Sequence, residues 1–234
     1  ATVSTGGTIV GTAAVAAVSG VVTYSGLGLT GATGTYTLTY TVTTGSTSLT
    51  ALTQTIAIAA GAATKLNLSR SSVGTASGAA FTTQPQVTLQ DSGSNTVTTT
   101  GTTITATISS GGTLVGTATA NTVSGVATFT NLGITGTATT SYTITYSSGS
   151  LTTATQSITV SVGAATQLVL TRSSVGTASG AAFTTQPQVT IKDSGGNVLA
   201  SDSSTQITAT ISSGGTLVGT TTATASSGVA TFSN

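Results

Sequence analysis

The sequence predicts an all-β chain made of tandem β-sandwich repeats. Apolar residues recur at every second position in short segments, as half-buried strands require, and no segment has the three-and-four spacing of a helix. Long segments also recur: residues 70–88 are identical to residues 172–190, and residues 104–117 are identical to residues 207–220. The resulting period of about 102 residues is longer than any solenoid repeat, and a unit of that length can fold alone.

The repeat divides the chain into one complete unit and two partial units. Residues 62–163 form the complete unit. Residues 1–61 are the back part of a unit, since residues 1–12 align with residues 106–117, and residues 164–234 are the front part of another. No Pro- or Ser-rich linker separates the units, so we expect short, rigid junctions and an extended rod.

Alternating apolar residues place the strands of the complete unit. Leu66 and Leu68 alternate with polar neighbours, and Tyr142, Ile144 and Tyr146 alternate with threonines, whose β-branched side chains suit a solvated sheet face. Seven short strands in about 100 residues predict a two-sheet sandwich. The expected strands cover residues 64–69, 86–90, 104–108, 117–121, 126–129, 142–146 and 158–162.

Proline and aspartate mark the ends of these strands. Pro85 and Pro187 stand just before a strand, where the missing N–H does least harm. Asp91 and Asp193 open tight turns, because a short polar side chain can accept a hydrogen bond from its own backbone.

Composition excludes several classes of function. Charged residues make up 3% of the chain, against about a quarter in an ordinary domain, and no basic stripe exists for nucleic acid. There is no Cys or His, hence no disulfide and no thiolate or imidazole metal site. No run of apolar residues is long enough to span a membrane, and the first residues do not form a signal peptide. A nearly uncharged surface favours lateral association of copies.

Three segments carry a resemblance to a known family. The turn at 193–197 reads Asp-Ser-Gly-Gly-Asn, residues 227–232 read Ser-Gly-Val-Ala-Thr-Phe, and Gly136 precedes the strand at 142–146. These features resemble the bacterial immunoglobulin-like tandem repeats of large surface adhesins, the invasin and intimin-like group. The resemblance implies extracellular spacer or adhesive roles and transfers no binding residue. The scarcity of acidic residues argues against a calcium-rigidified form.

The carboxylates do not form a metal or catalytic site in this interpretation. Calcium binds six to eight oxygens, usually from several carboxylates, whereas Asp91 and Asp193 each stand alone in a turn, so we interpret both as turn formers. Asp202 lies in the variable loop and is expected to be solvated. A Ser or Thr nucleophile needs an activating base, and glycoside hydrolysis needs a carboxylate pair. We therefore expect no catalytic, metal or cofactor site.

The cations have two interpretations each. Arg70 and Arg172 could contact a glycan or a neighbouring molecule, but we favour surface arginines near a junction. Lys65 and Lys192 could form an isopeptide crosslink with Asn or Asp. That chemistry needs a buried acid beside the lysine, and the chain has no Glu, so we do not expect it.

The remaining candidates are tyrosines, a sequon and threonine ladders. The five tyrosines could offer a platform for sugar rings, although Tyr142 and Tyr146 share a strand face with Ile144 and are expected in the core. The sequon at 67–69 has Val169 in place of Asn in the next unit and is interpreted as incidental. Ice binding needs a flat threonine array and is not expected on twisted strands. The tyrosines are Tyr24, Tyr36, Tyr40, Tyr142 and Tyr146.

The expected function is structural. We predict a non-enzymatic extracellular or cell-surface repeat protein that acts as a stalk, fibre or surface-layer component and contacts neighbouring copies of itself laterally or head to tail. The alternative is an adhesion module that binds a glycan or a host protein. Nearly identical loops in the copies favour the spacer.

The partial units allow two accounts. The chain is either a window on a longer array, or copies complete one another head to tail by donating strands. Residues 1–26 and 209–234 correspond to the same strands and would compete in such an exchange. The window is therefore the expectation from sequence.

Overall fold

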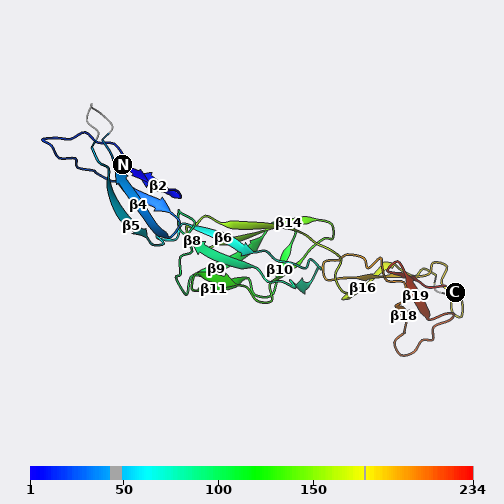
Figure 1. Cartoon of the computed structure of the whole chain (residues 1–234). Coiled ribbons are helices and arrows are strands. Elements are labelled where there is room, and N and C mark those ends of the chain that lie inside the picture. Colours follow the sequence, from blue (N-terminus) through cyan, green and yellow to red (C-terminus); the bar gives the residue numbers. More distant parts are fainter. Residues whose placement is uncertain (43–48, 177, 234) are drawn as a thin grey trace.

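The computed structural model describes residues 1–42, 49–176 and 178–233. All regular elements among these residues are β-strands, β1 to β20, as the alternating pattern predicts. No helix that could cross a membrane occurs in the described part of the chain. The strands lie in three successive groups along an elongated molecule, with the two termini at opposite ends (Figure 1). We call them the N-terminal group (β1–β5), the middle group (β6–β15) and the C-terminal group (β16–β20).

The middle group is one long sheet that curls over a short second sheet. The long sheet has the order β15-β14-β9-β11-β12-β8-β6. It bends at β11, where residues 119–121 pair with β9 and residues 122–123 pair with β12. A parallel bridge between Lys65 and Thr152 brings its two ends together. The bounds are β6 Lys65–Arg70, β8 Gln86–Gln90, β9 Thr103–Ile108, β11 Thr119–Val123, β12 Val126–Thr128, β14 Ser141–Ser147 and β15 Ala154–Thr159.

The short second sheet has β13 at its centre. Its order is β10-β13-β7, with β10 Thr113–Val115, β13 Gly133–Thr135 and β7 Ala79–Ala80. All three strands were missing from the sequence interpretation. Strands of two or three residues are too short to show apolar alternation.

The core of the middle group lies inside this curl. Phe129 and Tyr146 are fully buried, and their rings pack at a tilt with centroids 5.4 Å apart, a geometry that aromatic pairs favour. The alternation read from the sequence gave the correct inward face, since the predicted inward residues Val87, Ile104 and Ile144 are fully buried. Burial of this apolar face is the main stabilising contribution of the sheet.

Two predicted strand boundaries were wrong. The strand expected at 158–162 is β15 at Ala154–Thr159, and Val162 is 42% exposed. Residues 154–157 read Ala-Thr-Gln-Ser, which shows no apolar alternation, yet β14 holds them by backbone pairing. The strand expected at 117–121 is β11, shifted toward the C-terminus.

The outer groups contain fewer strands than the middle group. The N-terminal group has a sheet β1-β4-β5 and a separate hairpin β2-β3, with β1 Thr2–Val3, β2 Gly7–Val10, β3 Gly28–Gly31, β4 Gly34–Tyr40 and β5 Leu52–Ile58. The C-terminal group has one sheet, β16-β17-β20-β19-β18, with β16 Gln167–Arg172, β17 Gln188–Lys192, β18 Gln206–Thr208, β19 Thr222–Ser226 and β20 Val229–Thr231. Pro85 and Pro187 stand immediately before β8 and β17, as predicted.

Candidate functional site: the junctions between strand groups

The first junction is built on the turn that follows β8. Asp91 accepts the backbone N–H of Asn95 at 2.8 Å on Oδ1, and the Asn95 side-chain amide donates to both carboxylate oxygens at 3.2 and 3.0 Å. Two backbone bonds, from Asp91 N to Asn95 O and from Ser94 N to Asp91 O, close the turn. Asp91 is thus the turn former that the sequence predicted, and it also fixes the Asn95 side chain.

This turn also bonds to the preceding strand group. Asn95 Oδ1 accepts the N–H of Thr33 at 2.6 Å, and Asn95 Nδ2 donates to the carbonyl of Gly31 at 2.8 Å. The Asn95 amide therefore pairs with the β3–β4 turn much as a peptide group would. Asp91 Oδ2 accepts the N–H of Gly61, in the connection between the groups, at 2.8 Å. We call this arrangement the Asp–Asn clasp.

The second junction repeats the Asp–Asn clasp. Asp193 Oδ2 accepts the N–H of Gly163 at 2.8 Å, and Asn197 bonds to Asp193 as Asn95 does to Asp91. Asn197 Oδ1 accepts the N–H of Ala138 at 2.7 Å, and Asn197 Nδ2 donates to the carbonyl of Gly136 at 2.9 Å. Both junctions therefore use the same residue types on the same kinds of backbone group.

Hydrogen bonds keep the clasp carboxylates ionised. The Asn95 side chain and the Gly61 N–H lower the pKa of Asp91 to about 2. Burial opposes ionisation of Asp193, but hydrogen bonds from Gly163 and Asn197 outweigh it and lower the pKa of that carboxyl as well. Both carboxylates thus act as fixed acceptors at neutral pH.

The two junctions differ in one segment. At the second junction, residues 76–80 lie between β13 and the connection to the C-terminal group. Ser77 N donates to the carbonyl of Ser161 at 3.0 Å, Gly78 N donates to the carbonyl of Ile134 at 2.8 Å, and the Ser77 hydroxyl bonds to both backbone groups of Gly136. β7 at the end of this segment pairs with β13.

At the first junction the corresponding space is a groove. A cavity of about 330 Å³ lies there between the N-terminal and middle groups. It is lined by Val10, Gly28, Leu29, Thr30, Gly31, Ile58, Ala59, Gly61, Asp91, Ser92, Gly93 and Asn95. We call it the junction groove.

Three further charged candidates, Arg70, Arg172 and Lys65, make local hydrogen bonds. Arg70 and Arg172 each donate from Nε to a backbone carbonyl, of Gln84 at 2.8 Å and of Gln186 at 2.7 Å, beside the register shift that ends their strands. Lys65 donates to the Ser94 hydroxyl at 2.7 Å.

The sequence interpretation expected Asp202 to be solvated, but in the structure its carboxylate also binds the residues that follow it in the loop. It accepts hydrogen bonds from the N–H groups of Ser204 and Thr205 and from the Thr205 hydroxyl, which lower its pKa. No group of three or more His, Cys, Asp or Glu gathers anywhere in residues 1–42, 49–176 and 178–233.

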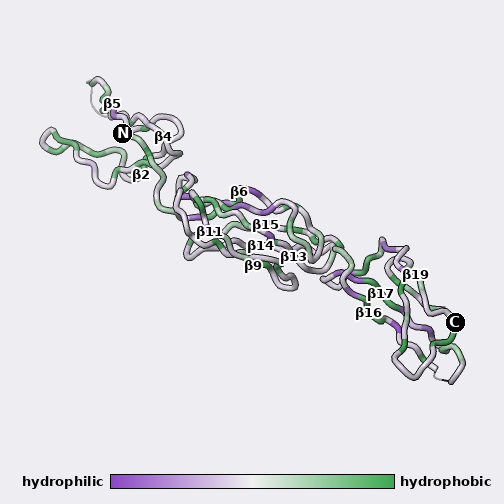
Figure 2. The backbone as a smooth tube through the Cα atoms, turned by 90° about the horizontal axis from the view of Figure 1, so that it is seen from below, coloured by the Kyte–Doolittle hydropathy of each residue, from purple (hydrophilic) through white to green (hydrophobic). Residues whose placement is uncertain are grey.

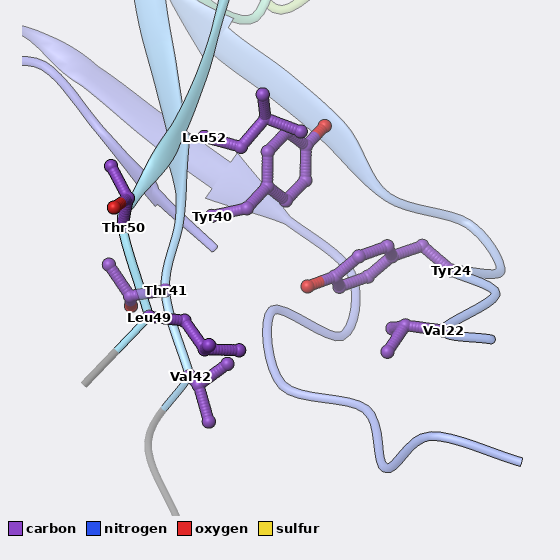
Figure 3. Close-up of a pocket in the computed structure, with 8 residues that line it drawn as sticks. All are labelled: Val22, Tyr24, Tyr40, Thr41, Val42, Leu49, Thr50 and Leu52. Atoms are coloured by element: carbon purple, nitrogen blue, oxygen red, sulfur yellow. The ribbon is translucent and has the colours of Figure 1, made fainter. Parts of the chain in front are cut away.

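The tyrosines separate into two environments. Tyr36, Tyr142 and Tyr146 are buried, the last two as predicted. The Tyr142 hydroxyl accepts the N–H of Thr137 at 3.0 Å. Tyr24 and Tyr40, with ring centroids 5.8 Å apart, instead line an open pocket of about 480 Å³ in the N-terminal group (Figure 3). Val22, Leu49 and Leu52 contribute its apolar wall.

The sequence interpretation missed the partners of the aspartates. It placed Asp91 and Asp193 in turns but gave no role to Asn95, Asn197 or Gly163. The signal was present, because Asp-Ser-Gly-x-Asn recurs with Asn at the fifth position in both turns. A turn alone does not require Asn there, so the recurrence pointed to a contact outside the turn.

Comparison with known proteins finds only distant structural likeness. No protein-family model and no curated protein matches the chain. Part of the chain is similar to a β-glucuronidase of Parabacteroides merdae, at 14% identity and a TM-score of 0.33, over 53% of this chain and 16% of that one. Another part-match is a glycosyl hydrolase family 2 member of Bacteroides cellulosilyticus, at 16% identity and a TM-score of 0.37, over 57% and 18% of the two chains. The chain thus spans less than a fifth of either protein, and likeness of this size carries no argument about its activity.

Proposed function

We propose that the chain is a non-enzymatic structural segment of an extracellular stalk, fibre or surface-layer component, built from immunoglobulin-like repeats with a period of about 102 residues. The observation that carries this proposal is the Asp–Asn clasp, present with the same bonds at both junctions. A spacer needs a junction that holds each successive unit in the same way. The resemblance to bacterial surface-adhesin repeats supports a cell-surface location.

The scarcity of charge supports the same proposal. With 3% charged residues, side-chain repulsion between copies is small, which favours close lateral packing in a fibre. The elongated shape also supports a structural role. The three strand groups follow one another in both views of the chain (Figures 1 and 2), and hydrophobic segments are spread along its whole length (Figure 2).

Small-angle scattering tests the structural role. We expect the chain to scatter as a rod, and the double variant N95A/N197A to scatter as a more flexible object at unchanged strand content. Thr55→Ala, at an exposed position of β5, serves as the control. A compact particle from the unaltered chain would contradict the proposal. Immunogold labelling of producing cells should show the chain at or beyond the cell surface.

A glycan- or protein-binding module is the second candidate, and the Tyr24–Tyr40 pocket is the observation that favours it. Two adjacent aromatic rings beside an apolar wall can stack on a sugar ring. Binding to a glycan array that is lost in the variant Y24A/Y40A would support this role. Absence of binding with intact rod-like scattering would leave the spacer.

A further inference from the structure

The turn of each clasp has a glycine at its third position that the turn itself does not require. The motif Asp-Ser-Gly-x-Asn places Gly93 in the first turn and Gly195 in the second. Neither glycine has a positive φ, because the left-handed residue of each turn is the next one, Ser94 at φ 66° and Gly196 at φ 79°. A side chain is thus tolerated where the backbone favours glycine, whereas glycine recurs at a position where the backbone conformation does not call for it.

The preceding strand group explains both glycines. A Cβ on Gly93 would lie 2.8 Å from the carbonyl oxygen of Gly31, and a Cβ on Gly195 would overlap the carbonyl oxygen of Gly136. These are the same carbonyls that accept the asparagine amides of the clasp. A Cβ would also press on the clasp asparagine itself, at 2.9 Å from Nδ2 in the first turn and 3.0 Å in the second. The third position therefore has to be bare for the asparagine and the carbonyl to meet.

The facing residue of the preceding group is a glycine for a different reason. A Cβ on Gly31 would lie 2.8 Å from the Tyr36 hydroxyl, and a Cβ on Gly136 would lie 2.7 Å from Cε2 of Tyr142. Both tyrosines are buried, and each hydroxyl also bonds to the residue that follows this glycine. The tyrosine thus fixes the backbone whose carbonyl the clasp uses, and two glycines lie in close contact at each junction.

We propose that Gly93 and Gly195 determine whether a junction closes, because only a turn without a side chain at this position lets the Asp–Asn clasp reach the preceding group. The inference rests on the proposed spacer function and adds its specificity. A turn that reads Asp-Ser-Gly-x-Asn gives a rigid joint, and a side chain at the third position gives a hinge at which the rod bends. Both glycines act through the clasp asparagine and are positioning residues.

Amide hydrogen exchange at the first clasp tests the proposal in the full chain. The N–H of Thr33 donates to Asn95 Oδ1, so its protection reports closure of the junction. The N–H of Asn95 donates to Asp91 Oδ1 and reports the turn alone. Gly93→Ala should lower the protection of the Thr33 N–H on the order of tenfold or more and leave that of the Asn95 N–H unchanged.

The second junction offers a matched control. Gly196→Ser places at the left-handed position the residue that the first turn already carries there, and a Cβ on Gly196 meets nothing within 4 Å. The N–H of Ala138, which donates to Asn197 Oδ1, should keep its protection in this variant. Gly195→Ala, one position earlier, should lower that protection as Gly93→Ala does at the first junction.

A double-mutant cycle separates a role at the junction from a role inside the turn. If Gly93 acts through the clasp, Gly93→Ala should add less than about twofold to the loss of Thr33 protection that Asn95→Ala causes, since the clasp that it disturbs is already gone.

Two results would overturn the proposal. One is full protection of the Thr33 N–H in the Gly93→Ala chain. The other is a loss that adds in full to that of Asn95→Ala, or that spreads to the Asn95 N–H, which would place the role of the glycine inside the turn. Rod-like scattering of the unaltered chain is a separate measurement, so the spacer role is judged independently.

Discussion

The two junctions share one clasp but differ in what fills the space beside it. At the second junction, residues 76–80 cover β13 and bury Gly136, whereas at the first junction β3 has a free edge and Gly31 borders a groove. The clasp residues occupy the same places in both. The clasp hydrogen bonds are therefore the same whether or not a further segment packs beside the strand that precedes them.

Glycine-to-alanine substitutions should give the largest difference in stability between the two junctions. Gly163→Ala should destabilise the chain by about 2 kcal/mol, because its methyl group has to displace the Ser77 carbonyl. Gly61→Ala should change stability by less than about 0.5 kcal/mol, since its nearest contact would be 3.6 Å away. Denaturant unfolding of the two variants measures the difference, and equal losses would show that the first groove is not open in solution.

Removing the side-chain amide of the clasp should loosen the first junction more than the second. Asn95→Ala should cost about 1 kcal/mol and loosen the angle between the N-terminal and middle groups, since all four side-chain hydrogen bonds of Asn95 are lost. Asn197→Ala should loosen the second junction less, because Ser77 and Gly78 of the segment 76–80 still pack against Gly195 and Ser194. Distances between spin labels on neighbouring groups report both angles, and broader distributions at the second junction would contradict the comparison.

Acid should open the clasp at low pH only. The pKa of Asp91 is about 2 in the folded chain against an ordinary value of 3.8, so its stabilising contribution is present above about pH 4 and lost as the pH falls through 2. We expect scattering to be unchanged from pH 8 to 4 and the first junction to become flexible near pH 2. Asp91→Asn should weaken the clasp at every pH and remove this transition.

A substitution inside the core, away from both junctions, should have the smallest effect. Within the part of the chain that the structure describes, the buried hydroxyls of Tyr146 and Ser72 have no hydrogen-bond partner of good geometry, and burial raises the pKa of Tyr146 more than the nearby Ser72 lowers it. Tyr146→Phe should therefore change the free energy of unfolding by less than about 0.5 kcal/mol and leave both junction angles unchanged. A loss above 2 kcal/mol, seen by thermal unfolding, would show an unrecognised role for this hydroxyl.

Period-two alternation was sufficient to predict most of the middle group. The strand at 86–90 was correct to the residue, and the inward face of β14 was correct because Tyr142, Ile144 and Tyr146 differ sharply in polarity from the threonines between them. The short strands β7 and β13 could not be predicted, since backbone pairing with a distant segment defines them rather than side-chain polarity.

The turn at the aspartate of the clasp could be predicted from the sequence, but the contacts of the asparagine could not. A turn at Asp91 follows from local chemistry, because an aspartate accepts N–H groups a few residues ahead. The bonds from Asn95 to Gly31 and Thr33 join residues more than sixty positions apart, and local pattern carries no information about such pairs. The recurrence of Asp-Ser-Gly-x-Asn in both turns was the indication that the sequence offered.

The Asp–Asn clasp has a consequence for how such a chain can change in length. The hydrogen bonds that Asn95 and Asn197 make to the preceding strand group go to main-chain atoms, at Gly31 and Thr33 and at Gly136 and Ala138. The side chains at positions 33 and 138 differ, yet the bonds are the same. The clasp therefore does not depend on these side chains, so in the proposed repeat architecture a duplication or deletion of whole repeats would change the length of the rod without requiring compensating substitutions at the junctions.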